Sequence, residues 1–271
     1  MTIRVEKKGH VTTVIHDRPE ARNAMDPASA VALHDAMLAF DADPEARVAV
    51  LWGAGGAFCA GWDLKYGASI ADDPARHQKD LRHSLGFPVG SAPAPRGPMG
   101  PTRLELSKPV IAAVEGPAVA GGMEVAMWCD VRVMAEDAYF GVYCRRWGIT
   151  LIDGGTVRLP RLVGQGRALE IILTGRKVPA EEALRIGLCE KVVPQGQARA
   201  AAEAMAADIA RFPQGAVRAD RKSVYDAHGL SVREGLKREW ANGLDAVSDE
   251  GLAGAARFAS GRGRHGDFGK I

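Results

Sequence analysis

The feature that most constrains the fold is an apolar segment that carries a single acid. Residues 117–130, PAVAGGMEVAMWCD, include Glu124 and follow KPVIAAVEG (108–116), which has the pattern of a buried strand. The paired glycines 121 and 122 mark the start of a helix after that strand. An unpaired buried carboxylate costs roughly several kcal/mol unless it is neutralised or hydrogen-bonded. Glu124 is therefore either a satisfied structural acid or a group that takes part in chemistry.

A second stretch repeats this arrangement earlier in the chain. The strand pattern RVAVLWG (47–53) runs into GGAFCAGWDLK (55–65), where glycine again stands at the start of a helix. Glycine lets the backbone approach a ligand closely, and the N–H groups at a helix start are ready donors. Two such donors, from two strand ends, can converge on one oxygen. The pattern therefore predicts an oxyanion hole.

The remaining patterns predict an α/β fold. A hairpin is expected at 3–16 and an amphipathic helix at 26–44, and helical spacing dominates the C-terminal part of the chain. The stretch 65–107 is rich in charge, Gly and Pro and predicts a mobile loop or lid. We expect a core formed by 1–195 and a helical C-terminal region formed by 196–271.

Composition excludes several classes of function. The formal net charge of +2 gives no reason to expect nucleic acid or an anionic membrane surface as a partner. We expect no membrane span and no secretory signal, because no run approaches about 20 apolar residues and the N-terminus lacks an apolar core. GAGGAF (53–58) lacks the last glycine of a dinucleotide fingerprint. Four widely spaced cysteines without a CxxC pair favour a reducing cytoplasm over a disulfide framework or a metal site: Cys59, Cys129, Cys144 and Cys189.

Two long motifs resemble a known family. AFCAGWDLK (57–65) and KPVIAAVEGPAVAGGMEVAMWCD (108–130) are similar to the AFxAGxDLK and KPxIAAVxGxAxGGGxELAxxCD motifs of the crotonase (enoyl-CoA hydratase/isomerase) superfamily. The resemblance continues through most of the chain and is densest over 108–194. It implies a spiral of ββα units with a helical C-terminal trimerisation region. It also implies homotrimers or homohexamers and an acyl-CoA thioester as ligand, with coenzyme A as part of the substrate and no separate cofactor.

The resemblance also implies roles for single residues. The oxyanion donors are the backbone N–H groups of Trp62 and Gly121, and Glu124 matches the first catalytic glutamate of the hydratases. The positions that match the substrate and CoA contacts are Ala24, Ala60, Asp63, Leu64 and Lys65.

One departure from the family pattern puts hydratase activity in question. Hydratases carry a second glutamate in an FGxPE segment, but this chain has FGVYCRRWG, with Cys144 at that position. Cys144 is either a proton donor, activated by Arg145 and Arg146, or a small packing residue. Asp153, in LIDGG, is the other candidate for the missing acid, and its alternative role is to cap the helix that follows.

Three hypotheses remain open from the sequence. The first is an acyl-CoA enzyme that stabilises a thioester enolate, with Glu124 as acid and base. Its reaction is hydration, double-bond isomerisation, a lyase reaction or hydrolysis. The second is a non-catalytic acyl-CoA-binding protein that lost half of the acid pair. The third is an oligomeric scaffold without a ligand, which leaves the two donor turns unexplained.

Overall fold

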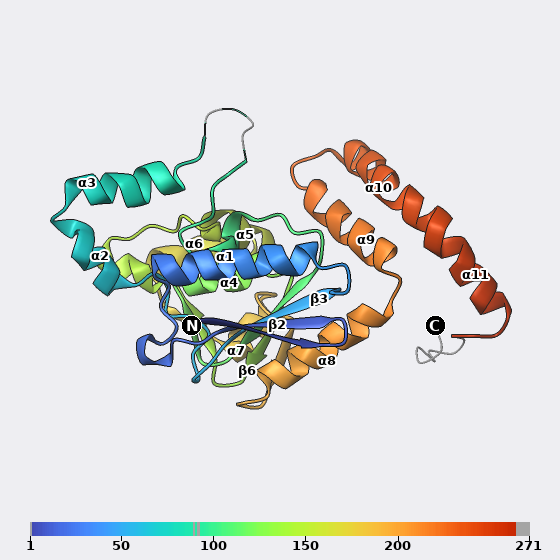
Figure 1. Ribbon diagram of the computed structural model, residues 1–271, viewed down its shortest axis with the longest axis horizontal. Helices are drawn as coiled ribbons and strands as arrows, with labels where there is room; N and C mark the ends of the chain where they lie inside the picture. Colours follow the sequence, from blue (N-terminus) through green and yellow to red (C-terminus); the bar gives the residue numbers. More distant parts are fainter. Residues whose placement is uncertain (1, 89, 91–92, 264–271) are drawn as a thin grey trace.

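The computed structural model describes residues 2–88, 90 and 93–263 (Figure 1). Residues 89, 91 and 92 of the predicted loop and residues 264–271 of the predicted helical region lie outside them. The strands are β1 Ile3–Lys8, β2 Val11–His16, β3 Val48–Gly53, β4 Val110–Val114, β5 Pro117–Val119, β6 Val131–Ala135, β7 Tyr139–Gly141, β8 Lys177–Pro179 and β9 Lys191–Val193. The α-helices are α1 Pro27–Ala42, α2 Leu64–Ala71, α3 Pro74–His77, α4 Gly121–Trp128, α5 Gly155–Val163, α6 Gln165–Thr174, α7 Ala180–Arg185, α8 Ala198–Arg211, α9 Gln214–Asp226, α10 Val232–Ala246 and α11 Leu252–Ala259.

A six-stranded sheet forms the centre of the molecule, in the order β1-β2-β3-β4-β6-β9. β1 and β2 pair antiparallel, which confirms the predicted hairpin, and the other neighbours pair parallel. β4 is buried along its whole length, as expected for a central parallel strand covered on both faces. α8 packs on this sheet through small residues four apart, which lets the helix lie close to the strands. These residues are Ala198, Ala202, Ala206 and Ala210.

α1 starts as the sequence predicts. Asp26 is its N-cap, its side chain accepts a hydrogen bond from Ser29 N at 2.8 Å, and Pro27 is the first helical residue. Leu33, Met37 and Phe40 are buried on one face of the helix. The α/β class with a helical C-terminal region is confirmed.

A smaller sheet, in the order β5-β7-β8, joins the two glycine turns to the core. β5 pairs parallel with β7, and β7 pairs antiparallel with β8. Cys59, in the first glycine turn, bridges Ala118 of β5: Cys59 N donates to Pro117 O at 3.1 Å, and Val119 N donates to Cys59 O at 3.0 Å. The sheet thus fixes the first turn against the start of the second.

The stretch 65–107 differs from the loop that its composition predicts. Its described part contains α3, the C-terminal residues of α2, a π-helix at Gln78–His83 and a 3-10 helix at Pro101–Arg103. The stretch is therefore not a loop throughout, and Met99 and Thr102 in its last part are buried. The buried backbone here satisfies its own polar groups, because Gly97 and Gly100 pair through two 2.9 Å hydrogen bonds. The mobility of the stretch stays a prediction.

The C-terminal helices α10 and α11 lie apart from the sheet, with α9 between them and the rest of the chain (Figure 1). They carry exposed apolar side chains, among them Val232, Leu236, Trp240, Leu252 and Phe258. The predicted trimerisation role of this region stays a prediction. Across the described residues, no helix combines the length and the apolar character that a membrane span requires.

Candidate functional site

The two glycine turns meet at one point. A Cβ placed on Gly61 would lie 3.0 Å from Ala120 Cβ and 3.3 Å from Gly121 N, and Gly61 has a φ of +94°. Gly122 is closer still to the first turn, since a Cβ there would lie 2.1 Å from Cys59 O. Glycine is therefore required for this contact, and the contact brings the start of α4 against the residue before Trp62.

The Trp62 N–H faces away from the hydrogen bonds that hold its turn, and the Gly121 N–H lies at the start of a helix. Met25 N donates to Gly61 O at 2.7 Å, and Asp63 N donates to Met25 O at 2.9 Å. This parallel bridge directs the N–H of the intervening Trp62 to the opposite side from Met25. Gly121 is the first residue of α4, so its N–H is one of the first-turn donors that a helix leaves without an intrahelical acceptor.

A cavity of about 560 Å³ lies in front of these turns. Seven of the predicted site residues line it together: Ala60, Trp62, Leu64, Gly121, Glu124, Cys144 and Asp153. Apolar side chains form much of the remaining wall, among them Leu81, Met99, Trp147, Ile149 and Ile152. The arrangement has the character of a small-molecule site, with a few polar groups set in an apolar wall.

Glu124 is buried on α4 and held by the start of α5. Its Oε1 accepts hydrogen bonds from Asp153 N at 2.9 Å and Gly155 N at 2.8 Å. Both bonds fall on one oxygen, which leaves Oε2 for the cavity that the residue lines. Burial raises the pKa of Glu124 to about 7, and the nearby Asp153 carboxyl adds to the rise. Glu124 is thus poised to gain or lose a proton near neutral pH.

Asp153 is 4% exposed and does not cap α5. The N-cap of α5 is Gly154, and no side chain caps that helix, so the predicted capping role is wrong. Asp153 Oδ1 instead accepts hydrogen bonds from Thr102 Oγ1 and from Met99 N at 3.1 Å. Burial raises the pKa of Asp153, while these two donors, Arg103 and Arg158 oppose the rise. Asp153 is therefore a second buried carboxyl in the wall of the same cavity.

Cys144 is buried in the wall, in the 3-10 helix Tyr143–Trp147. Burial raises the pKa of its thiol, and the Glu124 carboxyl raises it further, against a smaller lowering by Arg145. The expected activation of Cys144 by the neighbouring arginines is therefore wrong, because desolvation outweighs them. A protonated thiol fits both a packing residue and a proton donor, and the choice between these two roles of Cys144 stays a prediction.

The three other predicted residues lie outside the cavity wall. Asp63 caps α2 by accepting from Lys65 N at 2.9 Å, and it pairs with Arg18 at 2.7 Å. Its carboxylate is therefore committed to structure. Ala24 accepts a hydrogen bond from Arg18 through its carbonyl, and Lys65 is exposed. Contact of Ala24 and Lys65 with coenzyme A stays a prediction.

Sequence reasoning missed Met99 and Thr102. Met99 contacts both halves of the site: its N–H bonds Asp153, and a Cβ on Gly121 would lie 2.5 Å from Met99 Sδ. His77 lines the cavity from α3. The Pro- and Gly-rich composition around Met99 and Thr102 gives no periodic pattern from which their position could be predicted.

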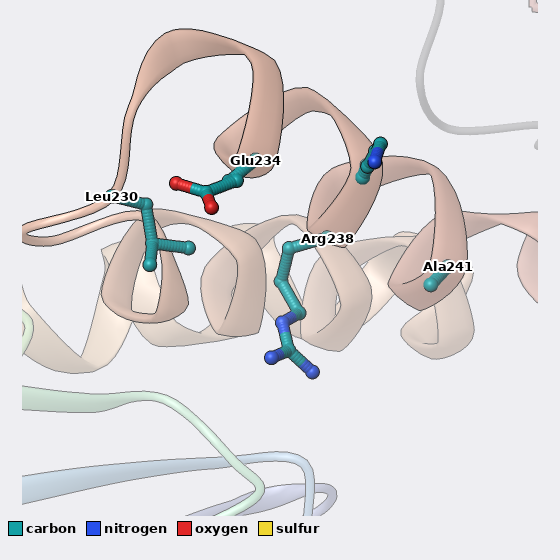
Figure 2. A pocket seen from close by; sticks show the side chains of 5 residues that line it. Leu230, Glu234, Arg238 and Ala241 are labelled. Carbon is teal, nitrogen blue, oxygen red and sulfur yellow. The ribbon is translucent and has the colours of Figure 1, made fainter.

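A second hollow, of about 300 Å³, lies against α10 (Figure 2). It is lined by Leu230, Glu234, Lys237, Arg238 and Ala241. Glu234 is engaged in a capping box with Ser231 at the start of α10. None of the predicted site residues lines this hollow. The described residues also contain no group of three or more His, Cys, Asp or Glu side chains placed to hold a metal ion.

Comparison with known proteins gives consistent similarities. A family model described as Enoyl-CoA hydratase/isomerase matches residues 6–86 and 102–253. The chain is 36% identical to "Enoyl-CoA hydratase EchA19" of Mycobacterium tuberculosis over 95% of this chain and 93% of that protein. It is 34% identical to "Carnitinyl-CoA dehydratase" of Salmonella arizonae over 96% of both chains. The crystal structure of enoyl-CoA hydratase EchA1 from Mycobacterium marinum superposes with a TM-score of 0.84, at 32% identity and 96% coverage of both chains.

Proposed function

The chain belongs to the enoyl-CoA hydratase/isomerase family, with the crotonase-type fold that its motifs imply, and we propose that it adds water to, or removes water from, an acyl-CoA thioester. The names of two relatives support this reaction class, one being a hydratase and the other a dehydratase. Coenzyme A takes part as the carrier of the substrate. Trimeric or hexameric assembly and a cytoplasmic location remain predictions.

One observation carries the proposal: Glu124 and Asp153 line one cavity with the two donor turns. They are linked directly, because the Asp153 N–H donates to Glu124 Oε1 at 2.9 Å and the Asp153 carboxyl raises the pKa of Glu124. Two carboxyls in different buried environments can divide the roles of acid and base: burial raises the pKa of Glu124 to about 7 and also raises the pKa of Asp153. Hydration needs one acid and one base. We assign to Asp153 the role of the second hydratase glutamate, whose position Cys144 occupies in this chain.

The proposed steps follow from that division. The Trp62 and Gly121 N–H groups bind the thioester oxygen, where negative charge develops as the enolate forms. The ionised carboxyl takes a proton from water, and the hydroxyl oxygen bonds to the β-carbon. The protonated carboxyl gives its proton to the α-carbon as the enolate collapses. The water molecule is thus divided between the two carbons, and the acid pair ends with the same number of protons.

The other open reactions use the same groups in different ways. Isomerisation needs one carboxyl to move a proton from one carbon to another, without water. A binding protein needs only the two N–H donors. Asp153 argues against the binding-only alternative, because it supplies a second carboxyl to the cavity wall.

The test is loss of the conjugated-double-bond absorbance of 2-enoyl-CoA thioesters, over several chain lengths, with wild type and Glu124→Gln. We expect turnover by wild type and a loss of about 10²–10⁴-fold in Glu124→Gln, with thioester binding retained. Equal rates in the two proteins would contradict the role of Glu124. Binding without absorbance loss in wild type would contradict hydration, and product analysis would then distinguish isomerisation and hydrolysis from binding alone.

A further inference from the structure

The Asp153 carboxyl is held by a segment distant in the chain. Thr102 Oγ1, 51 residues away, donates to Asp153 Oδ1, and Met99 N donates to the same oxygen at 3.1 Å. Thr102 is 2% exposed, so its hydroxyl has no competing access to bulk water. Two donors on one oxygen fix the carboxyl plane and leave Oδ2 for the cavity that Asp153 lines.

The backbone around Thr102 is shaped to make this contact. Gly97 and Gly100 close a paired turn, and a Cβ on Gly97 would lie 2.0 Å from Thr102 Oγ1 and 2.5 Å from Asp153 Oδ1. Only glycine at 97 therefore leaves room for the hydrogen bond. Arg158 closes the other side, because its guanidinium donates to Asp153 O at 2.9 Å and to Thr102 O at 2.7 Å. Both backbone segments are thereby tied at the point where the side chains meet.

We propose that Thr102 is a positioning residue for Asp153: its hydroxyl orients the carboxyl toward the cavity and stabilises the ionised form. This inference rests on the proposed function, in which Asp153 is half of the acid pair. Thr102 does not line the cavity and acts through Asp153 alone.

Removal of the Thr102 hydroxyl should change the pKa of Asp153 in a predictable direction. A donor to a carboxylate favours the charged form, so its loss raises the pKa of Asp153. The charged or titratable groups around Asp153 stay unchanged in such a variant, so they do not produce the shift. They are Glu124 on α4, Arg158 on α5, Cys59 in the first glycine turn, and Arg96 and Arg103 on either side of the paired turn.

The experiment compares the pH dependence of kcat/KM in wild type, Thr102→Val and Thr102→Ser. We expect one limb of the profile to move upward by about one pH unit in Thr102→Val, and Thr102→Ser to restore it because it keeps the hydroxyl. Thr13→Val is the matched control. Thr13 is a buried threonine on β2 whose hydroxyl donates to Glu203 at 2.9 Å, away from the cavity, so its loss should leave the profile unmoved.

The outcomes separate this inference from the proposed function. A profile of Thr102→Val that coincides with that of wild type, while Asp153→Asn has lost activity, would overturn the positioning role alone. An Asp153→Asn variant with full activity would overturn the acid pair itself.

The free energy of unfolding provides a second readout, which does not require that the protein turns over a substrate. The free energy of unfolding that Thr102→Val loses should grow as pH rises through the Asp153 pKa, and this growth should vanish when Asp153→Asn is present. A loss that is constant with pH would overturn the inference. Thr102→Ala removes the same donor without placing a methyl group against Asp153 Oδ1, and replaces Thr102→Val if that variant does not fold.

Discussion

The two acids of the cavity are held in different ways. Glu124 lies on α4 directly behind a glycine turn and accepts two backbone N–H groups from the start of α5. Asp153 precedes α5 and depends on a side-chain hydroxyl, Thr102, together with one N–H of the turn before it. Backbone donors persist whatever side chains surround them, whereas a hydroxyl is lost with a single substitution. Asp153 is therefore the acid whose position a single side-chain substitution can change more easily.

The largest effect that sharpens this comparison is expected for Asp153→Asn. The amide keeps the shape and accepts the same hydrogen bonds but cannot exchange a proton, so kcat/KM should fall by about 10²–10⁴-fold. Steady-state rates on the best 2-enoyl-CoA measure it. Cys144→Ala changes a neighbouring wall residue with a protonated thiol and should cost less than about tenfold. If the two variants exchange these effects, Cys144 is the second group and Asp153 is not.

The next effect concerns the free energy of unfolding, which falls when the buried Glu124 ionises. Its pKa of about 7 lies above its ordinary value of 4.5, so the folded protein binds more protons than the unfolded chain between these values. Wild-type stability should therefore fall as pH rises through this range. Gln does not titrate, and the stability of Glu124→Gln relative to wild type should increase between pH 4 and pH 8 by about 3 kcal/mol. Urea unfolding at both values measures the difference, and a difference that does not change with pH would mean that Glu124 keeps an ordinary pKa.

The smallest effect compares one glycine beside each acid. A Cβ on Gly155 would lie 3.0 Å from Glu124 Oε1, a contact that a shift of a few tenths of an ångström relieves. A Cβ on Gly97 would lie 2.0 Å from Thr102 Oγ1 and must displace it from Asp153. We expect Gly97→Ala to lower kcat/KM by about 10²-fold and Gly155→Ala by less than about tenfold. Both rates are measured at a temperature where thermal unfolding shows that the two variants are folded. Equal losses of kcat/KM would mean that the two acids tolerate a nearby Cβ equally well.

The sequence allowed the first acid to be predicted because the elements that carry it are contiguous in the chain, although its two N–H donors, Asp153 and Gly155, are not. Glu124 follows a buried strand, a glycine turn and three residues of helix, and each step has a pattern of its own. The α/β fold was predictable for the same reason. The meeting of the Trp62 and Gly121 turns is a long-range contact that the family motifs imply. Gly61 and Ala120 lie side by side there, and the convergence of the two N–H groups on one oxygen stays a prediction.

The support of the second acid was not predictable in this way. Thr102 and Asp153 are 51 residues apart, and the connecting chain contains β4, α4 and β6. A stretch rich in Pro and Gly indicates turns but does not indicate which distant side chain a turn will meet. Asp153 was one of two candidates from the sequence, and its capping role was wrong because Gly154 takes the N-cap position. The tertiary contact with Met99 and Thr102, and not the local sequence, sets the position of the Asp153 carboxyl.

The most direct test of the acid pair is a double-mutant cycle of Glu124→Gln and Asp153→Asn, measured as kcat/KM on the same 2-enoyl-CoA. Groups that act as a unit give losses that do not multiply, because removal of either one already disables the shared step. The account predicts that the double variant is no slower than the slower single variant, within about threefold. Losses that multiply would show two independent contributions and would contradict a coupled pair of carboxyls.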